Sequence, residues 1–173
     1  MAEIVSFAPI ADENAEILIL GSMPGCASLN ANQYYAHKRN AFWRIMSELL
    51  KLDAKLSYDA RTRALKSARI ALWDVIHACE RKGSLDASIE PSTLVTNDFP
   101  NFFRTHQKIK QVFFNGTKAE TCFKQYVLKT LNFDGISFTR LPSTSPAHAA
   151  VSFERKLDAW RLILDDKQLM SST

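Results

Sequence analysis

The chain has 173 residues, 46% of them apolar and 23% charged, which is the composition of a globular domain with one hydrophobic core. No apolar run approaches the roughly 20 residues that cross a bilayer, and the acidic N-terminus lacks the basic start of a signal peptide, so we expect a cytoplasmic protein with no membrane partner. The net charge of +4, from 22 Lys and Arg against 18 Asp and Glu, is compatible with a polyanionic partner but does not require one.

Apolar runs bounded by turn residues predict four strands, at about 16–21, 70–76, 112–115 and 136–141. Helical spacing predicts helices at about 40–52, 57–68, 97–104, 117–129 and 152–166, with Asn40 as the N-cap of the first and Asn97 and Asp98 capping the third. The segments 1–15, 21–39 and 77–96 are predicted as an N-terminal arm and two long loops. Because strands alternate with helices, we expect an α/β fold in which helices cover both faces of a central four-stranded parallel sheet, formed by residues 1–173 as a single domain.

The most distinctive polar residues follow the predicted strands. They are Gly21–Gly25, Asp74, Asn115 with Gly116, and Pro142–His148. Since the carboxyl ends of parallel strands share one edge of a sheet, we expect a cleft there. Glycines let backbone N–H groups approach an anion, and serine hydroxyls add donors, so this edge suits scattered phosphate contacts.

Several kinds of chemistry are disfavoured by spacing. The three cysteines, Cys26, Cys79 and Cys122, are far apart and form no C-x-x-C, which argues against a disulfide framework, a zinc site or an iron–sulfur cluster. The four histidines are isolated, with no H-E-x-x-H, and no nucleotide-binding glycine motif or nucleophile elbow is present. We therefore predict no metal and no cofactor.

The motif GSMPG at 21–25, followed by QYYAHKRNAFWRIM at 33–46, resembles the uracil-DNA glycosylase superfamily, and most closely its hypoxanthine-DNA (deoxyinosine) glycosylase branch. The later loop LPSTSPAHA at 141–149 is similar to a second motif of that superfamily, a Pro-Ser loop after the last strand. The resemblance implies a four-stranded parallel sheet between helices. It also implies a monofunctional enzyme that hydrolyses the N-glycosidic bond of a flipped-out deaminated base in double-stranded DNA and leaves an abasic site. We expect the protein to be a monomer. In a prokaryote it would be associated with the nucleoid.

Two positions depart from the pattern of these relatives. Met23 stands where many relatives have an Asp or Asn that positions the attacking water, and Leu141 stands where several have a His or Asn before the Pro-Ser pair. The deoxyinosine branch places its catalytic Asn in the following segment, which makes Asn40 the expected catalytic residue. Lys38 replaces a Pro that is usual in that segment.

The resemblance assigns the other site residues by position. Tyr35 would stack on the flipped base, and the Asp74 carboxylate would accept N1–H of hypoxanthine while rejecting adenine, which has a lone pair at N1. The expected base-binding residues are Gly21, Ser22, Met23, Tyr35, Asp74 and Asn115, although Asn115 can equally stabilise its own turn. The expected DNA-binding residues are Pro24, Gly25, Ser84, Ser143, Thr144, Ser145 and His148.

Three alternatives remain open at this point. The first is a uracil- or thymine-mismatch glycosylase with relaxed base choice. The second is a catalytically inactive domain of the same fold that binds nucleic acid or a nucleotide, a reading that Met23 and Leu141 keep open. The third is an enzyme acting on a small phosphate ester, which the lack of metal ligands disfavours.

Overall fold

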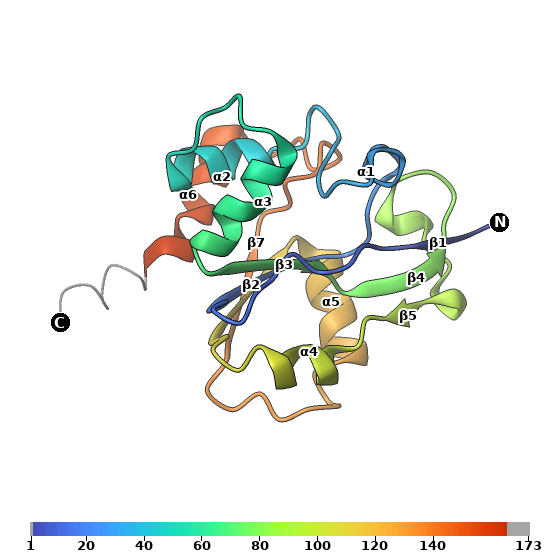
Figure 1. Cartoon of the computed structure of the whole chain (residues 1–173). Coiled ribbons are helices and arrows are strands. Elements are labelled where there is room, and N and C mark those ends of the chain that lie inside the picture. The colour runs from blue at the N-terminus through green and yellow to red at the C-terminus, as the bar shows by residue number, and fades with distance from the viewer. Residues whose placement is uncertain (1, 166–173) are drawn as a thin grey trace.

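The structure is a computed structural model, and it describes residues 2–165. Its centre is a four-stranded parallel sheet in the order β3-β2-β6-β7. The strands are β2 (Ile17–Gly21), β3 (Ile70–Asp74), β6 (Gln111–Asn115) and β7 (Ser137–Leu141). This confirms the predicted fold class, and Figure 1 shows helices on both sides of the sheet.

The two faces of β2 contribute to two separate cores. Ile17 and Ile19 pack with α2 (Phe42–Leu50), α3 (Tyr58–Ser67) and α6 (Phe153–Trp160), while Leu18 and Leu20 pack with α4 (Phe99–Thr105) and α5 (Thr117–Tyr126). Every residue of β2 is buried. Because both faces are covered, the strand is a continuous apolar run rather than an alternating one.

A second, smaller sheet was not predicted. β1 (Glu3–Val5), β4 (Ile76–Glu80) and β5 (Val95–Thr96) form an antiparallel sheet in the order β1-β4-β5. Two short 3₁₀ turns, Asp86–Ser88 and Pro91–Thr93, lie between β4 and β5. The predictions of an N-terminal arm at 1–15 and a long loop at 77–96 were therefore wrong, because both segments contain strands. Their strands are short and pair with segments far away in the chain, so local periodicity carries no sign of them.

Several boundaries also differ from the prediction. The strand expected at 70–76 ends at Asp74, and the loop expected at 21–39 contains the short helix α1 (Cys26–Ala31). The helix expected from residue 40 begins at Phe42 with Ala41 at its N-cap position. Asp98 caps α4 as predicted, by accepting a hydrogen bond from the Asn101 backbone, but Asn97 does not. Residue 166, the expected end of the last helix, lies outside the described residues.

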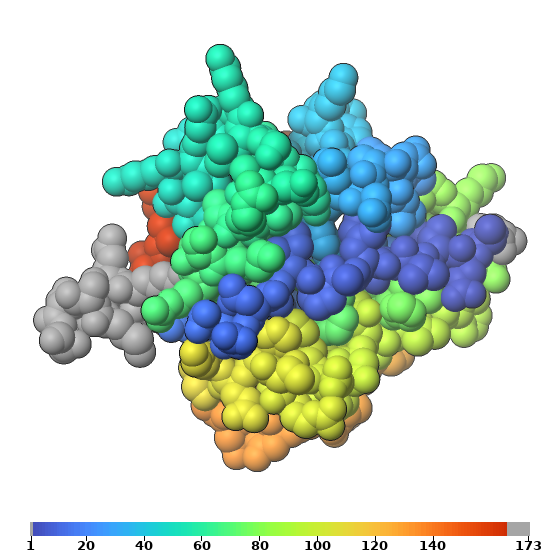
Figure 2. All heavy atoms as spheres, in the orientation of Figure 1, coloured from blue at the N-terminus to red at the C-terminus, as the bar shows by residue number. Residues whose placement is uncertain are grey.

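The N-terminal residues (dark blue in Figure 2) cross the middle of one face of the molecule. They are held there by backbone hydrogen bonds between Ile10 and Leu72 and by the pairing of β1 with β4. Among residues 2–165, no helix has the length and apolar character that a bilayer span requires.

Candidate active site

The carboxyl ends of the parallel strands lie side by side, as the sequence predicted. Gly21 pairs with Asp74 at the ends of β2 and β3, and Asn115 pairs with Leu141 at the ends of β6 and β7. The strands β2 and β6 are in turn neighbours, with Leu20 opposite Phe114. Residues that are separated by up to 120 positions in sequence are thereby gathered at one edge of the sheet.

Gly21 is surrounded so closely that only a glycine fits there. A Cβ at this position would lie 2.4 Å from Asp74 Oδ1 and 2.8 Å from the Tyr35 hydroxyl. Real Cβ atoms essentially never approach other atoms so closely, so any side chain would displace one of these two oxygens. Gly21, Tyr35 and Asp74, all predicted base-binding residues, therefore meet at one point.

Tyr35 is held in an unusual backbone conformation. Its φ angle is +55°, in the left-handed region that bulky residues rarely adopt. Its ring stacks on Phe42, with the ring centroids 4.2 Å apart and the planes inclined by 28°. Such strained residues are concentrated at functional sites, where the surrounding structure holds them in place.

Asp74 is a buried carboxyl group with an altered acidity. Its residue is only 3% exposed. Burial, followed by the charge of Asp86, raises the pKa of Asp74 to about 7, and Arg81 opposes the shift. Burial and the nearby Asp74 charge likewise raise the pKa of the Tyr35 hydroxyl.

Two oxygens at this point are shielded from water and lack a hydrogen-bond partner. Within residues 2–165, neither Asp74 Oδ2 nor the Tyr35 hydroxyl makes a hydrogen bond of good geometry, although Asn115 lies close to the hydroxyl. Leaving such groups unpaired costs about 1–3 kcal/mol each. An arrangement this costly is expected where a ligand supplies the missing partner.

The segment after β4 contributes a carboxylate that the sequence did not single out. The Ser22 hydroxyl donates to both carboxylate oxygens of Asp86, at 2.8 Å each. Burial raises the pKa of Asp86, whereas the Ser22 hydrogen bond and the cations Arg81 and Lys118 oppose the shift. The Ser22 hydroxyl, next to Gly21, is therefore oriented by a charged group 64 residues further along the chain.

Arg81 fastens this segment to the first motif. It is buried, and its guanidinium donates to the Pro24 carbonyl at 2.6 Å and to the Gly83 carbonyl at 2.8 Å. The backbone N–H of Cys26 donates to Ser84 Oγ at 2.9 Å. Of the predicted DNA-binding residues, Pro24 and Ser84 are thus linked through the same two loops. A Cβ added at Gly25 would make an ordinary contact with Ser84 Oγ, at 3.5 Å.

Asn115 holds the Pro-Ser loop. Its side-chain amide donates to the Thr144 hydroxyl and accepts from the Thr144 backbone, both at 2.9 Å. Thr144 is 1% exposed, so its hydroxyl orders the loop and is not available to a phosphate in this conformation. The Ser143 hydroxyl accepts from the Ser145 backbone, and His148 at the end of the loop is exposed. Of the alternatives for Asn115, the contacts favour stabilisation of its turn.

Asn40 lies two residues before α2. Its side-chain oxygen accepts the Phe42 backbone N–H at 3.0 Å. Asn40 was predicted as the N-cap of this helix, which is wrong, because Ala41 occupies that position and Asn40 precedes it. The bond still fixes the Asn40 amide, and the second lone pair of its oxygen is left for another donor. Asn40 is only partly exposed.

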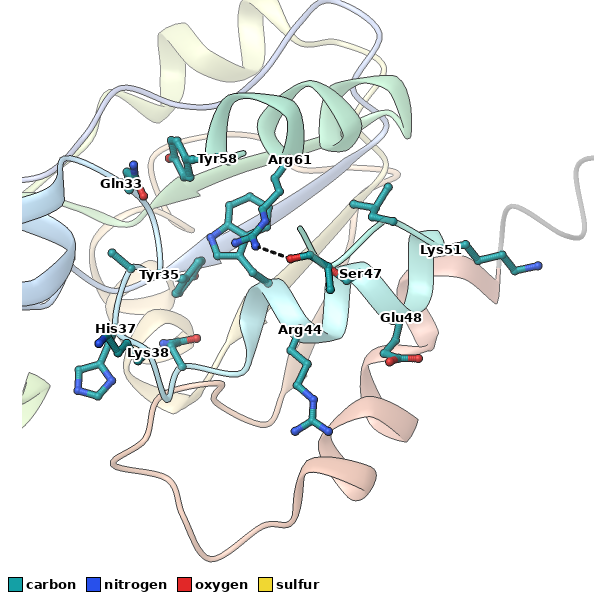
Figure 3. A pocket seen from close by; sticks show the side chains of 15 residues that line it. Gln33, Tyr35, His37, Lys38, Arg44, Ser47, Glu48, Lys51, Tyr58 and Arg61 are labelled. Atoms are coloured by element: carbon teal, nitrogen blue, oxygen red, sulfur yellow. Dashed lines mark hydrogen bonds between the residues drawn. The ribbon is translucent and has the colours of Figure 1, made fainter. Parts of the chain in front are cut away.

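Asn40 and Tyr35 also line a hollow of about 820 Å³ beside α2 and α3 (Figure 3). Its rim carries more positive than negative side chains: Lys38, Arg44, Lys51 and Arg61 against Glu48. The closed cluster around Gly21 does not open into this hollow, because Asp74 and Gly21 are not among its lining residues. Tyr35 belongs to both, since it lines the hollow and its hydroxyl lies beside Gly21.

The described residues contain no group of three or more His, Cys, Asp or Glu side chains arranged to hold a metal ion. Sequence reasoning missed Asp86, Arg81 and Asn97, whose side chain donates to the Asp74 carbonyl at 2.7 Å. Asp86 and Arg81 lie in the stretch predicted as a loop, and no spacing rule connects a loop carboxylate to a partner in a distant motif. Only the pairing of the small sheet brings them to the site.

Comparison with known proteins gives one consistent result. The chain matches the family model of the uracil DNA glycosylase superfamily over residues 8–166. It is 34% identical over 159 residues to a hypoxanthine DNA glycosylase of Methanosarcina acetivorans, covering 91% of this chain and 95% of the relative. It is 41% identical over 114 residues to a hypoxanthine DNA glycosylase of Methanosarcina barkeri, covering 65% of this chain and 71% of the relative.

The fold has a solved counterpart as well. A solution NMR structure from Methanosarcina acetivorans, described as a candidate uracil DNA glycosylase, has a TM-score of 0.75 at 32% identity. The match covers 92% of this chain and 98% of that chain.

Proposed function

Because the chain belongs to the uracil DNA glycosylase superfamily, we propose that it removes hypoxanthine from DNA by hydrolysing its N-glycosidic bond. The predicted enzyme class, a DNA glycosylase and hence a hydrolase of N-glycosyl bonds, is confirmed by the family and the relatives. The choice of base, the flipping of that base and the roles of individual residues are our proposal. The relatives that act on hypoxanthine, at 34% and 41% identity, support this choice of base.

The observation that carries the proposal is the unpaired Oδ2 of Asp74, whose carboxyl group meets the Tyr35 hydroxyl at Gly21. An ionised carboxylate only accepts hydrogen bonds, and hypoxanthine offers N1–H as a donor. Adenine presents a lone pair at N1, so the buried charge would be left unpaired against it. Such a mismatch discriminates by several kcal/mol, enough to protect the normal base.

Access to Asp74 requires the substrate base to leave the DNA stack and Tyr35 to move. Unstacking costs a few kcal/mol and is least for a mispaired base. The Tyr35 hydroxyl and Asp74 Oδ1 both lie beside Gly21. We infer that the entering base displaces this hydroxyl and stacks against the Tyr35 ring, whose other face is supported by Phe42.

Asn40 is proposed to hold the attacking water. Its amide is fixed by the Phe42 backbone, so one lone pair of its oxygen can receive a water hydrogen near the sugar C1′. An amide is a poor base, and its contribution is therefore positioning and electrostatics. The backbone of Gly25 and the hydroxyls of Ser84, Ser143 and Ser145, with His148, are the proposed phosphate contacts in double-stranded DNA.

Uracil is the second candidate substrate, for one specific reason. Its N3–H is a donor beside a carbonyl, so it offers Asp74 the same pairing as N1–H of hypoxanthine. The two bases differ in size and not in this hydrogen bond. Base choice between them then depends on the space that opens when Tyr35 moves.

A panel of duplex oligonucleotides tests the function. Each duplex carries a single hypoxanthine, uracil, xanthine or mismatched thymine, and abasic sites are cleaved with alkali after incubation. We expect scission at hypoxanthine, with uracil weaker. Scission at uracil alone would replace our proposal with the uracil enzyme, and tight binding without scission in any lane would favour the inactive binding domain.

A further inference from the structure

The proposed reaction lacks one component, a group that takes the proton of the attacking water. Asn40 cannot accept that proton, Met23 cannot do acid–base chemistry, and the Asp74 carboxylate is occupied by the base. Among residues 2–165, the remaining carboxylate bonded to the first motif is Asp86, through Ser22. The function proposed above gives the Asp86 carboxylate no role.

We propose that Ser22 and Asp86 form a proton relay, in which Ser22 Oγ accepts a hydrogen of the attacking water as its own hydrogen passes to Asp86. This inference rests on the proposed glycosylase function and names further residues for it. Ser22 contacts the reacting water, and Asp86 is a positioning residue that acts through Ser22.

The direction of the Ser22 hydrogen bond supports the relay. An ionised carboxylate has no hydrogen to give, so the bond at 2.8 Å to each oxygen of Asp86 must be donated by the Ser22 hydroxyl. The hydroxyl has only one hydrogen, and it is committed to Asp86. Ser22 Oγ therefore presents only lone pairs to the site. Once Asp74 has taken N1–H and the base has displaced the Tyr35 hydroxyl, the attacking water is a donor that can fill one of them.

The position of Ser22 is fixed from two sides. Its carbonyl accepts the Ile76 backbone N–H at 3.1 Å, and the preceding Gly21 carbonyl accepts that of Val75 at 2.8 Å. On the other side, Arg81 and Ser84 tie the Asp86 segment to the same loop through Pro24 and Cys26. A relay requires donor and acceptor to stay in register, and this double attachment provides that.

The electrostatic surroundings of Asp86 suit a proton acceptor. The groups that influence it are Ser22 and the cations Arg81 and Lys118, which favour the ionised form, and burial, which raises its pKa and makes the carboxylate a better base. Across the site, Asp86 in turn raises the pKa of Asp74 and of Tyr35. Two neighbouring carboxyls with separate tasks are a common arrangement in acid–base catalysis.

The atoms balance without a further reactant. The water oxygen forms the bond to C1′, and the C1′–N9 bond breaks with its electron pair going to the base. One water proton goes to Ser22 Oγ while the Ser22 proton goes to Asp86. The departing base anion then takes a proton from Asp86, or it takes one from solvent while Asp86 releases its own proton to solvent. Either route returns Asp86 to its ionised form and restores the relay.

The test measures single-turnover release of hypoxanthine by Ser22→Ala, Asp86→Asn and the double variant. We expect each to be slower than the wild type by about 100-fold or more, the usual size of an acid–base contribution, with DNA affinity unchanged. The double variant should be no slower than the slower single one, because both break the same relay. Ser22→Thr, which keeps a hydroxyl, should retain most of the rate.

The pH profile separates a relay from a merely structural bond. In Asp86→Asn, the fall in rate at low pH that is caused by protonation of Asp86 should disappear. The remaining fall, caused by protonation of Asp74, should move to lower pH because Asp74 has lost a neighbouring negative charge. The matched control is the exposed Ser92–Glu90 pair, whose hydroxyl–carboxylate bond is 2.9 Å. Glu90→Gln should change neither rate nor profile.

Two results would overturn the relay while leaving the proposed function intact. One is that the wild type excises hypoxanthine and a folded Ser22→Ala variant excises it at the same rate. The other is an Asp86→Asn variant that is slow but keeps the wild-type pH profile. If the wild type itself releases no base, the proposed function fails instead, so the two failures are distinguishable.

Discussion

Replacing Asp74 by Asn should make the protein more stable at alkaline pH while impairing its activity. The pKa of this carboxyl is about 7 in the folded protein against an ordinary value of 3.8, so folding penalises its ionised form. In the unfolded chain the group ionises near pH 4. Its favourable contribution to stability is therefore complete below about pH 4 and is lost as the pH rises from there to about 7.

The size of the effect follows from the two pKa values. At 1.36 kcal/mol for each tenfold change in proton affinity, the difference between about 7 and 3.8 corresponds to about 4 kcal/mol above pH 7. Asn has nearly the same shape and carries no charge. We therefore expect Asp74→Asn to match the wild type near pH 4 and to exceed its free energy of unfolding by up to about 4 kcal/mol at pH 8.

Urea unfolding followed by circular dichroism at pH 4, 6 and 8 measures this difference. Asp158→Asn, at a side chain that is 87% exposed, is the matched control and should track the wild type throughout. An Asp74→Asn variant whose stability relative to the wild type does not change with pH would refute the claim that Asp74 is buried at a cost.

Three further predictions concern the same site. Gly21→Ala should destabilise the fold by roughly 1–3 kcal/mol and abolish excision, because its Cβ would displace Asp74 Oδ1 or the Tyr35 hydroxyl. Thermal melting and an excision assay measure these two effects, and unchanged activity would contradict the prediction. Asn40→Ala should lower the single-turnover rate by about 100- to 1,000-fold without weakening DNA binding, and a full rate would remove Asn40 from the mechanism. Tyr35→Phe should gain about 1 kcal/mol in urea unfolding by removing an unpaired hydroxyl, and it should retain excision, whereas Tyr35→Ala should lose stacking and excise poorly.

The parts of the fold that could be predicted are those in which neighbouring residues carry the information. The apolar run of β2 and the glycines after it predict a buried strand with a binding loop at its end, because both faces of such a strand must be covered. The meeting of Gly21, Asp74 and Asn115 at one edge follows from parallel strands alone. The identity of the family follows from the motifs around Gly21 and Asn40.

The parts that could not be predicted depend on distant pairing. The small sheet is made of strands of five residues or fewer, and β1 pairs with a segment more than 70 positions away. Asp86 acquires a role only when that sheet carries it to Ser22. Asn40 shows a different, local error. Capping chemistry predicts that its side chain bonds the start of α2, which it does, but the helix begins two residues later than predicted.

Release of the free base from DNA is the most direct test of our central claim. Two duplexes identical except for hypoxanthine or adenine at one position are incubated with excess enzyme at pH 8, where Asp74 is ionised, and the released base is identified by mass spectrometry. We predict rapid release of hypoxanthine and none of adenine. Stoichiometric binding of the hypoxanthine duplex with no base released would contradict the account.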